Sequence, residues 1–251
     1  MAGRLYAGTS GFSYPGWIPA FYPPGTRGDR FLGHYGAILS TCELSSTYRR
    51  QPDAALLARW RALVAPGFRF ALKLHAATSL RAWASDPTGG LERLLAPVPA
   101  LGPSLGTTLF RVPAGQARDD GRLERLLAAW PGTVPLAMEL QHPSWVDDEV
   151  HARLRAAGAV LVATETDDAP DPPLLVTGPF LYVRLRRTAY DPAILDAWAA
   201  RLEPFLAAGR DVYAFFRHDE GGEAPGRALA LAARLPAFAV RPGDRPSDTR
   251  D

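Results

Sequence analysis

Residues 68–75 read FRFALKLH, and every second side chain in this stretch is large and apolar. The two sets of alternating residues are Phe68, Phe70, Leu72 and Leu74 on one side and Arg69, Ala71, Lys73 and His75 on the other. Successive side chains of a strand point to opposite sides of the sheet, so this alternation predicts a β-strand with one strongly apolar face. The other face carries a charged residue, Lys73, near the end of the strand, and other candidate strands of the chain repeat this feature.

Seven further apolar runs of similar length are spread over the whole sequence. Together the eight candidate strands are residues 5–9, 42–45, 68–74, 107–112, 136–140, 160–163, 180–185 and 212–216. Segments of helical spacing separate most of them, with Asp119 and Asp191 as candidate N-caps. Alternating strands and helices predict an α/β fold with a parallel sheet, and eight strands close a single (β/α)8 barrel of the TIM type. We expect the sixth crossover, residues 165–178, to be an irregular loop.

The composition is that of one folded domain. The chain has 251 residues, 47% hydrophobic and 22% charged, which predicts a barrel over residues 1–240 and a frayed, polar tail over 241–251. A net charge of +2 does not by itself indicate binding to nucleic acid or membrane. The single Cys42 excludes an internal disulfide, and no apolar stretch has the length of a signal peptide or membrane span. We expect a cytoplasmic protein without a membrane partner, and the oligomeric state stays open.

On five of the predicted strands, the less apolar side carries a charged residue near the carboxyl end of the strand. These charged residues are Glu43, Lys73, Arg111, Glu139 and Arg184. In a closed barrel they converge on the mouth, the end where active sites of this fold lie. Buried charges need partners or a ligand, so one interpretation is a purely structural ion-pair network. The cations outnumber the carboxylates, however, and Arg186 adds another, so we expect a net-positive mouth that binds a phosphate or carboxylate.

Several roles are open to these residues. Lys73 is the only lysine among 28 basic residues, and it could pair with a carboxylate, bind an anion or form a Schiff base. We expect pairing or anion binding, because Glu43 and Glu139 oppose the low pKa that Schiff-base formation needs. The two glutamates, with His142, could transfer protons, or the glutamates could simply hold the arginines in place.

Several motifs resemble those of the YecE-like family, a widespread family of unknown function. They include GTSGFSYPGWIPAFYP at 8–23, CELSSTYRRQP at 42–52, AMELQHPSW at 137–145 and FLYVRLR at 180–186, and the matching blocks cover nearly the whole chain. The resemblance implies a TIM-type barrel and no settled activity. It also implies that residues of the family pattern are present here: they are Glu43, Lys73, Glu139, Arg184 and the HPSW element at 142–145.

The chain departs from the family pattern on two neighbouring strands. The fourth strand has Arg111 where the family usually has glutamine, and the fifth has Gln141 where the family usually has arginine. We hypothesise that the guanidinium has moved one strand across and serves the same pocket. Further replacements follow the seventh and eighth strands, at residues 186–187 and 217–218.

Other candidate ligand contacts follow the strands in sequence: they are Tyr14, Tyr48, Arg49, His75 and Trp145. The strand-end histidines and glutamates could hold a divalent metal, but no HxH or HExxH spacing indicates one, and we expect no cofactor. The leading interpretation is an enzyme that acts on a small anionic substrate through carboxylate or histidine proton transfer. The alternatives are a metal-dependent phosphodiesterase or nuclease acting on nucleic acid, and a non-catalytic ligand-binding barrel.

Overall fold

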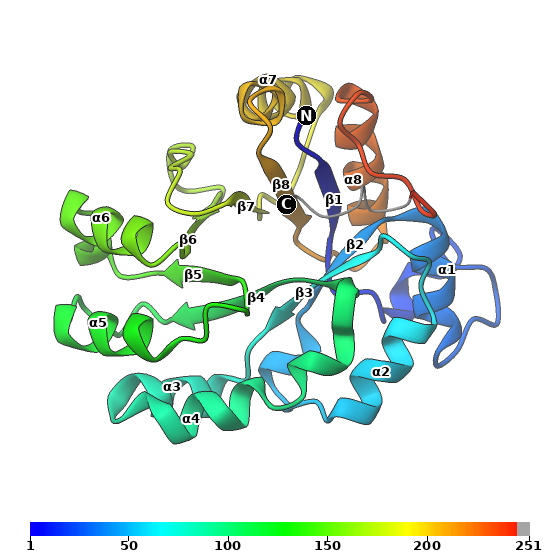
Figure 1. Ribbon diagram of the computed structural model, residues 1–251. Helices are drawn as coiled ribbons and strands as arrows, with labels where there is room; N and C mark the ends of the chain where they lie inside the picture. Colours follow the sequence, from blue (N-terminus) through cyan, green and yellow to red (C-terminus); the bar gives the residue numbers. More distant parts are fainter. Residues whose placement is uncertain (245–251) are drawn as a thin grey trace.

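A computed structural model describes residues 1–244, in which eight parallel strands close a barrel in chain order (Figure 1). The strands are β1 (Leu5–Ser10), β2 (Thr41–Leu44), β3 (Arg69–Lys73), β4 (Leu105–Val112), β5 (Leu136–Leu140), β6 (Val160–Thr164), β7 (Phe180–Leu185) and β8 (Asp211–Phe216). The barrel closes because β8 pairs with β1 in parallel, with Tyr6 beside Tyr213. The predicted single α/β barrel is therefore confirmed.

Helices pack around the outside of the barrel (Figure 1). They are α1 (Arg30–Ile38), α2 (Ala54–Ala62), α3 (Ala76–Ala84), α4 (Pro87–Leu95), α5 (Asp120–Ala129), α6 (Asp148–Ala156), α7 (Pro192–Ala207) and α8 (Glu223–Arg234). The carboxylates of Asp119 and Asp191 cap α5 and α7 as predicted, since each accepts a hydrogen bond from a backbone N–H three residues later. Residues 165–178, all within the described part of the chain, connect β6 to β7 without a helix.

The apolar side chains form two separate cores, as the strand alternation predicts. The larger core lies between the barrel wall and the helices, and it contains Phe68, Phe70, Leu72 and Leu74 from the third strand and its flanks. The smaller core fills the amino-terminal half of the barrel interior. There the rings of Tyr6 and Tyr213 stack with centroids 4.8 Å apart. Side chains therefore fill the interior at this end, and the buried charged residues Glu43, Lys73, Glu139 and Arg184 lie nearer the carboxyl ends of their strands.

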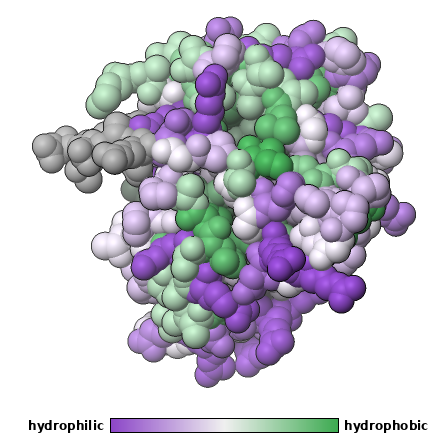
Figure 2. All heavy atoms as spheres, turned by 90° about the vertical axis from the view of Figure 1, so that its right-hand side faces the viewer, coloured by the Kyte–Doolittle hydropathy of each residue, from purple (hydrophilic) through white to green (hydrophobic). Residues whose placement is uncertain are grey.

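The surface of the face shown in Figure 2 is mainly hydrophilic, with smaller apolar areas between polar side chains. No helix within residues 1–244 combines the length and the apolar character needed to cross a bilayer. The predicted frayed tail begins at Arg241, whose backbone N–H donates to the Asp244 carboxylate at 2.8 Å in a turn. The rest of that tail lies outside the described residues.

Candidate functional site

One arginine joins two buried glutamates at the carboxyl end of the barrel. Arg184 on β7 donates to both carboxylate oxygens of Glu43 on β2, through Nη2 at 2.8 Å and Nε at 3.0 Å. Its Nη1 donates to Oε1 of Glu139 on β5 at 2.7 Å. All three side chains are buried. The sequence predicted that these residues converge, and the geometry shows that a single guanidinium serves both carboxylates.

This arrangement keeps both glutamates ionised. Burial acts to raise the pKa of Glu43, but the charges of Arg184 and Lys73 outweigh it and lower the pKa to about 2. The hydroxyl of Tyr182 also donates to Oε2 of Glu43 at 2.7 Å, which further favours the charged form. The pKa of Glu139 is lowered in the same way, since Arg184 and Arg111 overcome the effect of burial.

Arg111 lies at the edge of the same network. Its Nη2 donates to Oε1 of Gln141 at 2.7 Å, and its Nε lies 3.3 Å from Oε2 of Glu139. About 29% of the Arg111 side chain remains exposed. Arg111 is thus held by β5 on one side and open to the mouth on the other.

Lys73 differs from these arginines because its ammonium group has no carboxylate within ion-pair distance among the described residues. Nζ lies 4.1 Å from the centre of the Tyr48 ring, and the residue is only 7% exposed. Burial and the charge of Arg184 lower the pKa of Lys73 to about 8, against the opposing effect of Glu43 and Glu139. The two glutamates oppose a low pKa, as the sequence led us to expect, but desolvation is the larger effect.

Arg186 and His218 lie at the same end of the barrel and line the same cavity. Nη1 of Arg186 is buried and has no hydrogen-bond partner in the described part of the protein. Burial and the neighbouring Arg184 lower the pKa of this guanidinium. The His218 ring stacks on Tyr14 with centroids 4.8 Å apart, and burial together with Arg186 lowers the pKa of the imidazole.

These side chains surround a cavity of about 540 Å³ at the barrel mouth. Seven residues predicted from the sequence line it: Tyr14, Tyr48, Arg49, Lys73, Arg111, Arg184 and Arg186. Glu43 and Glu139 lie beneath the cavity rather than in its wall. Five of the lining side chains are cationic bases, so the wall is strongly positive.

The family profile described as protein of unknown function DUF72 matches residues 6–249. The chain belongs to the DUF72 family. This is the YecE-like family that the sequence motifs indicated. The family description assigns no activity, and no curated protein matches the chain significantly.

Solved structures of two other DUF72 family proteins share the fold. The one from Thermotoga maritima MSB8 has 24% sequence identity and a TM-score of 0.77, over 93% of this chain and 99% of its own. The one from Enterococcus faecalis V583 has 19% identity and a TM-score of 0.76, over 99% of both chains. At these identities the likeness concerns the fold alone.

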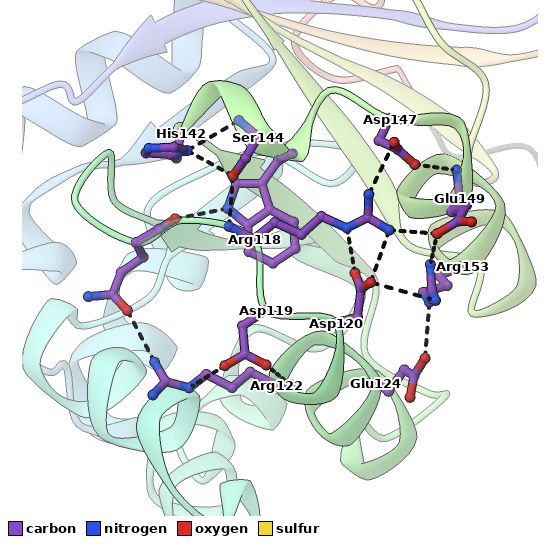
Figure 3. Close-up of polar contacts among 12 residues, drawn as sticks. Arg118, Asp119, Asp120, Arg122, Glu124, His142, Ser144, Asp147, Glu149 and Arg153 are labelled. Carbon is purple, nitrogen blue, oxygen red and sulfur yellow. Dashed lines mark hydrogen bonds and ion pairs between the residues drawn. The ribbon is translucent and has the colours of Figure 1, made fainter.

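In this DUF72 protein three of the predicted site residues lie away from the cavity. The His142 imidazole contacts the Ser144 hydroxyl at 2.8 Å and caps the short helical turn that follows β5, as Figure 3 shows. The indole of Trp145 is buried and donates to the backbone of Gln116 at 3.0 Å. His75 contacts the Thr78 hydroxyl at 2.9 Å at the start of α3. The structure thus gives each of these residues a local structural contact.

The segment after β5 belongs to a surface ion-pair network centred on Arg118 (Figure 3). The Arg118 guanidinium contacts Asp120 at 2.7 Å, Asp147 at 3.1 Å and Glu149 at 2.7 Å, while its backbone N–H donates to Ser144. The network therefore ties the start of α5 to the start of α6. The HPSW element is bound to this network through Ser144, and none of its residues lines the cavity.

Sequence reasoning missed some lining residues and a third buried carboxylate, in addition to Glu43 and Glu139. Ser10, Ser13, Ser45 and Ser46 also line the cavity, and their position at or shortly after the ends of predicted strands was the signal available. His218, one of the strand-end histidines considered as a metal ligand, lines the cavity as well. Glu165 follows β6 and is fully buried, where it accepts hydrogen bonds from Arg187 at 2.6 Å and Trp198 at 2.8 Å. Within residues 1–244, no group of three or more His, Cys, Asp and Glu side chains is placed to hold a metal ion.

Proposed function

We propose that this protein binds a small anionic substrate, bearing a phosphate or carboxylate group, in the cavity at the barrel mouth. The observation that carries the proposal is the presence of two cations in the cavity wall that have no carboxylate partner among the described residues. Lys73 is buried, and Arg186 is half-buried with a buried Nη1. Buried charges without a partner cost free energy, which an anionic ligand would offset.

The arginines of the wall have different roles in this proposal. Arg184 is engaged by Glu43 and Glu139, so its part is to hold the floor of the cavity. Arg111 and Arg186 keep guanidinium N–H groups available for a ligand, and planar guanidinium groups suit phosphate and carboxylate oxygens. An anion between these two arginines would also lie near Lys73.

Proton transfer is assigned to groups that face the cavity. Lys73 has a pKa of about 8 and can exchange a proton near neutral pH. His218, whose pKa burial lowers, lies in the same wall. Glu43 and Glu139 act as positioning residues, because their carboxylates are bound by Arg184 and stay ionised. His142 lies outside the cavity and takes no part.

The test is thermal unfolding in the presence of sodium phosphate, sodium sulfate and sodium pyruvate, at ionic strength matched with sodium chloride. A ligand that binds only the folded state raises Tm, and at 100 times its Kd it contributes about 2.7 kcal/mol. We expect a rise with at least one of these anions that chloride does not produce.

The matched variants are Arg186→Met in the cavity wall and Arg125→Met on the exposed face of α5. Arg186→Met should reduce the anion-dependent rise in Tm, whereas Arg125→Met should leave it unchanged. Equal rises in both variants, or no rise in the wild-type protein, would contradict the proposal. The metal-dependent phosphodiesterase and the non-catalytic barrel stay predictions from the sequence.

A further inference from the structure

The cavity contains the one ε-amino group of the chain, and its surroundings suit a covalent role. We propose that Lys73 forms an imine with the carbonyl carbon of an anionic carbonyl compound bound in the cavity. This inference rests on the proposed anion site and names the substrate class as small molecules with both a carbonyl and a phosphate or carboxylate group.

The position of Nζ is the first support. Arg184 and Arg111, the cations that flank Lys73 in the mouth, are both paired with glutamates, so a carboxylate masks part of each charge. Nζ of Lys73 contacts the face of the Tyr48 ring instead, at 4.1 Å from its centre. A ring face restrains the amine without accepting its protons as a carboxylate would. The amine therefore stays available to the 540 Å³ cavity that it lines.

The charges around Lys73 provide the second support. Four charged groups act on it from four strands, namely Glu43, Arg111, Glu139 and Arg184. Burial and the two arginines destabilise the ammonium more than the two glutamates stabilise it. With a pKa of about 8, about a tenth of the amine is neutral at pH 7, many times the fraction of an ordinary lysine. Only the neutral amine can attack a carbonyl carbon.

The chemistry needs no further reactant. The neutral nitrogen forms a bond to the carbonyl carbon, and a proton moves from nitrogen to the carbonyl oxygen to give a carbinolamine. Loss of that hydroxyl as water leaves the C=N bond, which is protonated to an iminium. Glu43 and Glu139, both ionised, lie near enough to stabilise this new cation. Arg111 and Arg186 would bind the phosphate or carboxylate group of the same molecule.

The experiment traps the imine by reduction. The intact protein is incubated with dihydroxyacetone phosphate or with pyruvate, sodium borohydride is added, and the product is measured by mass spectrometry with peptide mapping. Dihydroxyacetone, which has the same carbonyl but no charge, is the matched control. Lys73 is the only lysine, so an adduct on an ε-amine can have only one location, and mapping separates it from the α-amine of Met1.

We expect an adduct at Lys73 with at least one anionic probe. Its yield should exceed that with dihydroxyacetone by about tenfold, the scale of one hydrogen bond to a charged group. The yield should rise between pH 6 and pH 9, as the amine with a pKa of about 8 loses its proton. Protein unfolded in urea should lose the preference for the anionic probe.

The variant Lys73→Arg keeps a positive charge but has no nucleophilic amine, so it should give no adduct at residue 73. Arg125→Met on the exposed face of α5 is the control and should give the wild-type adduct yield. If the wild-type protein is stabilised by these anions but no adduct forms at Lys73 with either probe, the imine is excluded and the anion site stands. If neither stabilisation nor adduct is found, both proposals fail. Equal adduct yields from charged and uncharged probes would show ordinary lysine reactivity and also overturn the inference.

Discussion

The Arg111 side chain on β4 donates a 2.7 Å hydrogen bond to the side chain of Gln141, which directly follows β5. These are two of the positions at which the sequence departs from the pattern of the family that it resembles. Their contact means that a guanidinium attached at either position can reach the same part of the mouth. The structure thereby provides a physical basis for the hypothesis that the arginine has moved one strand across.

Exchanging these two residues should therefore matter less than changing one of them. Arg111→Gln removes a guanidinium, and Gln141→Arg places two guanidinium groups side by side. Arg111→Gln should weaken anion binding about tenfold, the scale of one hydrogen bond to a charged group. The double variant should bind within about twofold of the wild type, because additivity fails for residues in contact. Binding is measured from the anion-dependent rise in Tm, and damage by the double variant equal to that of a single variant would refute the exchange.

Glu43→Gln should destabilise the protein strongly. The change removes one carboxylate from a buried guanidinium that has two, and breaking a buried ion pair costs about 3 kcal/mol or more. Urea denaturation measures the free energy of unfolding. Glu92→Gln on the exposed part of α4 is the control and should have almost no effect.

The contribution of Glu43 to the free energy of unfolding should also depend on pH, and it should decrease as the pH falls. Its pKa falls from an ordinary 4.5 to about 2 on folding, so the unfolded chain binds the proton first. The stabilisation is complete above pH 4.5 and is lost as the pH falls toward 2. The difference in unfolding free energy between wild type and Glu43→Gln should shrink over this range. A constant difference would show that the glutamate does not titrate there.

Lys73 should contribute a pH dependence of the same sign, but in an alkaline range. Its pKa falls from 10.5 to about 8 on folding, so between these values the unfolded chain holds a proton that the folded protein has lost. Stability therefore rises with pH in this window relative to a variant without the amine. Comparing wild type with Lys73→Met in urea at pH 7.5 and pH 10 checks this. If the difference in unfolding free energy between wild type and Lys73→Met were the same at the two pH values, a low pKa for Lys73 would be contradicted.

Glu165→Gln separates stability from binding. Glu165 is fully buried and is bound by Arg187 and Trp198, but it does not line the cavity. Losing its charge should lower the free energy of unfolding by about 3 kcal/mol. The additional stabilisation by phosphate should equal that of the wild type. A loss of both would indicate that the connection after β6 also shapes the mouth.

The alternation of side chains was enough to predict the barrel and the convergence of Glu43, Lys73 and Arg184. Alternation determines which side of the wall a residue faces, and that side is independent of the details of packing. It does not determine which groups pair, because pairing depends on the stagger of strands and on side-chain length. Sequence reasoning therefore predicted a network but not that Arg184 would join both glutamates.

The residues that follow the strands were predicted less well, for a related reason. Tyr48 and Arg49 do line the cavity, but His142 and Trp145 occupy an equivalent place after β5 and do not. The course of a loop depends on its local contacts, and here Arg118 and Gln116 hold the segment outward. Glu165 was missed because the residues after it have no helical spacing, although the strand before it ends at the mouth like the others.

The closure of the barrel at its amino-terminal end brings distant parts of the chain together. The backbone of Leu5 bonds to Phe238 at 2.8 Å and to Val240 at 3.0 Å, on the face opposite the cavity. A circularly permuted chain that is opened near Asp168, in the connection without a helix, and in which a linker joins Asp244 to Met1 should keep every strand pair. For the same reason, attaching the protein to a solid support through this face would leave the mouth of the barrel open to solvent.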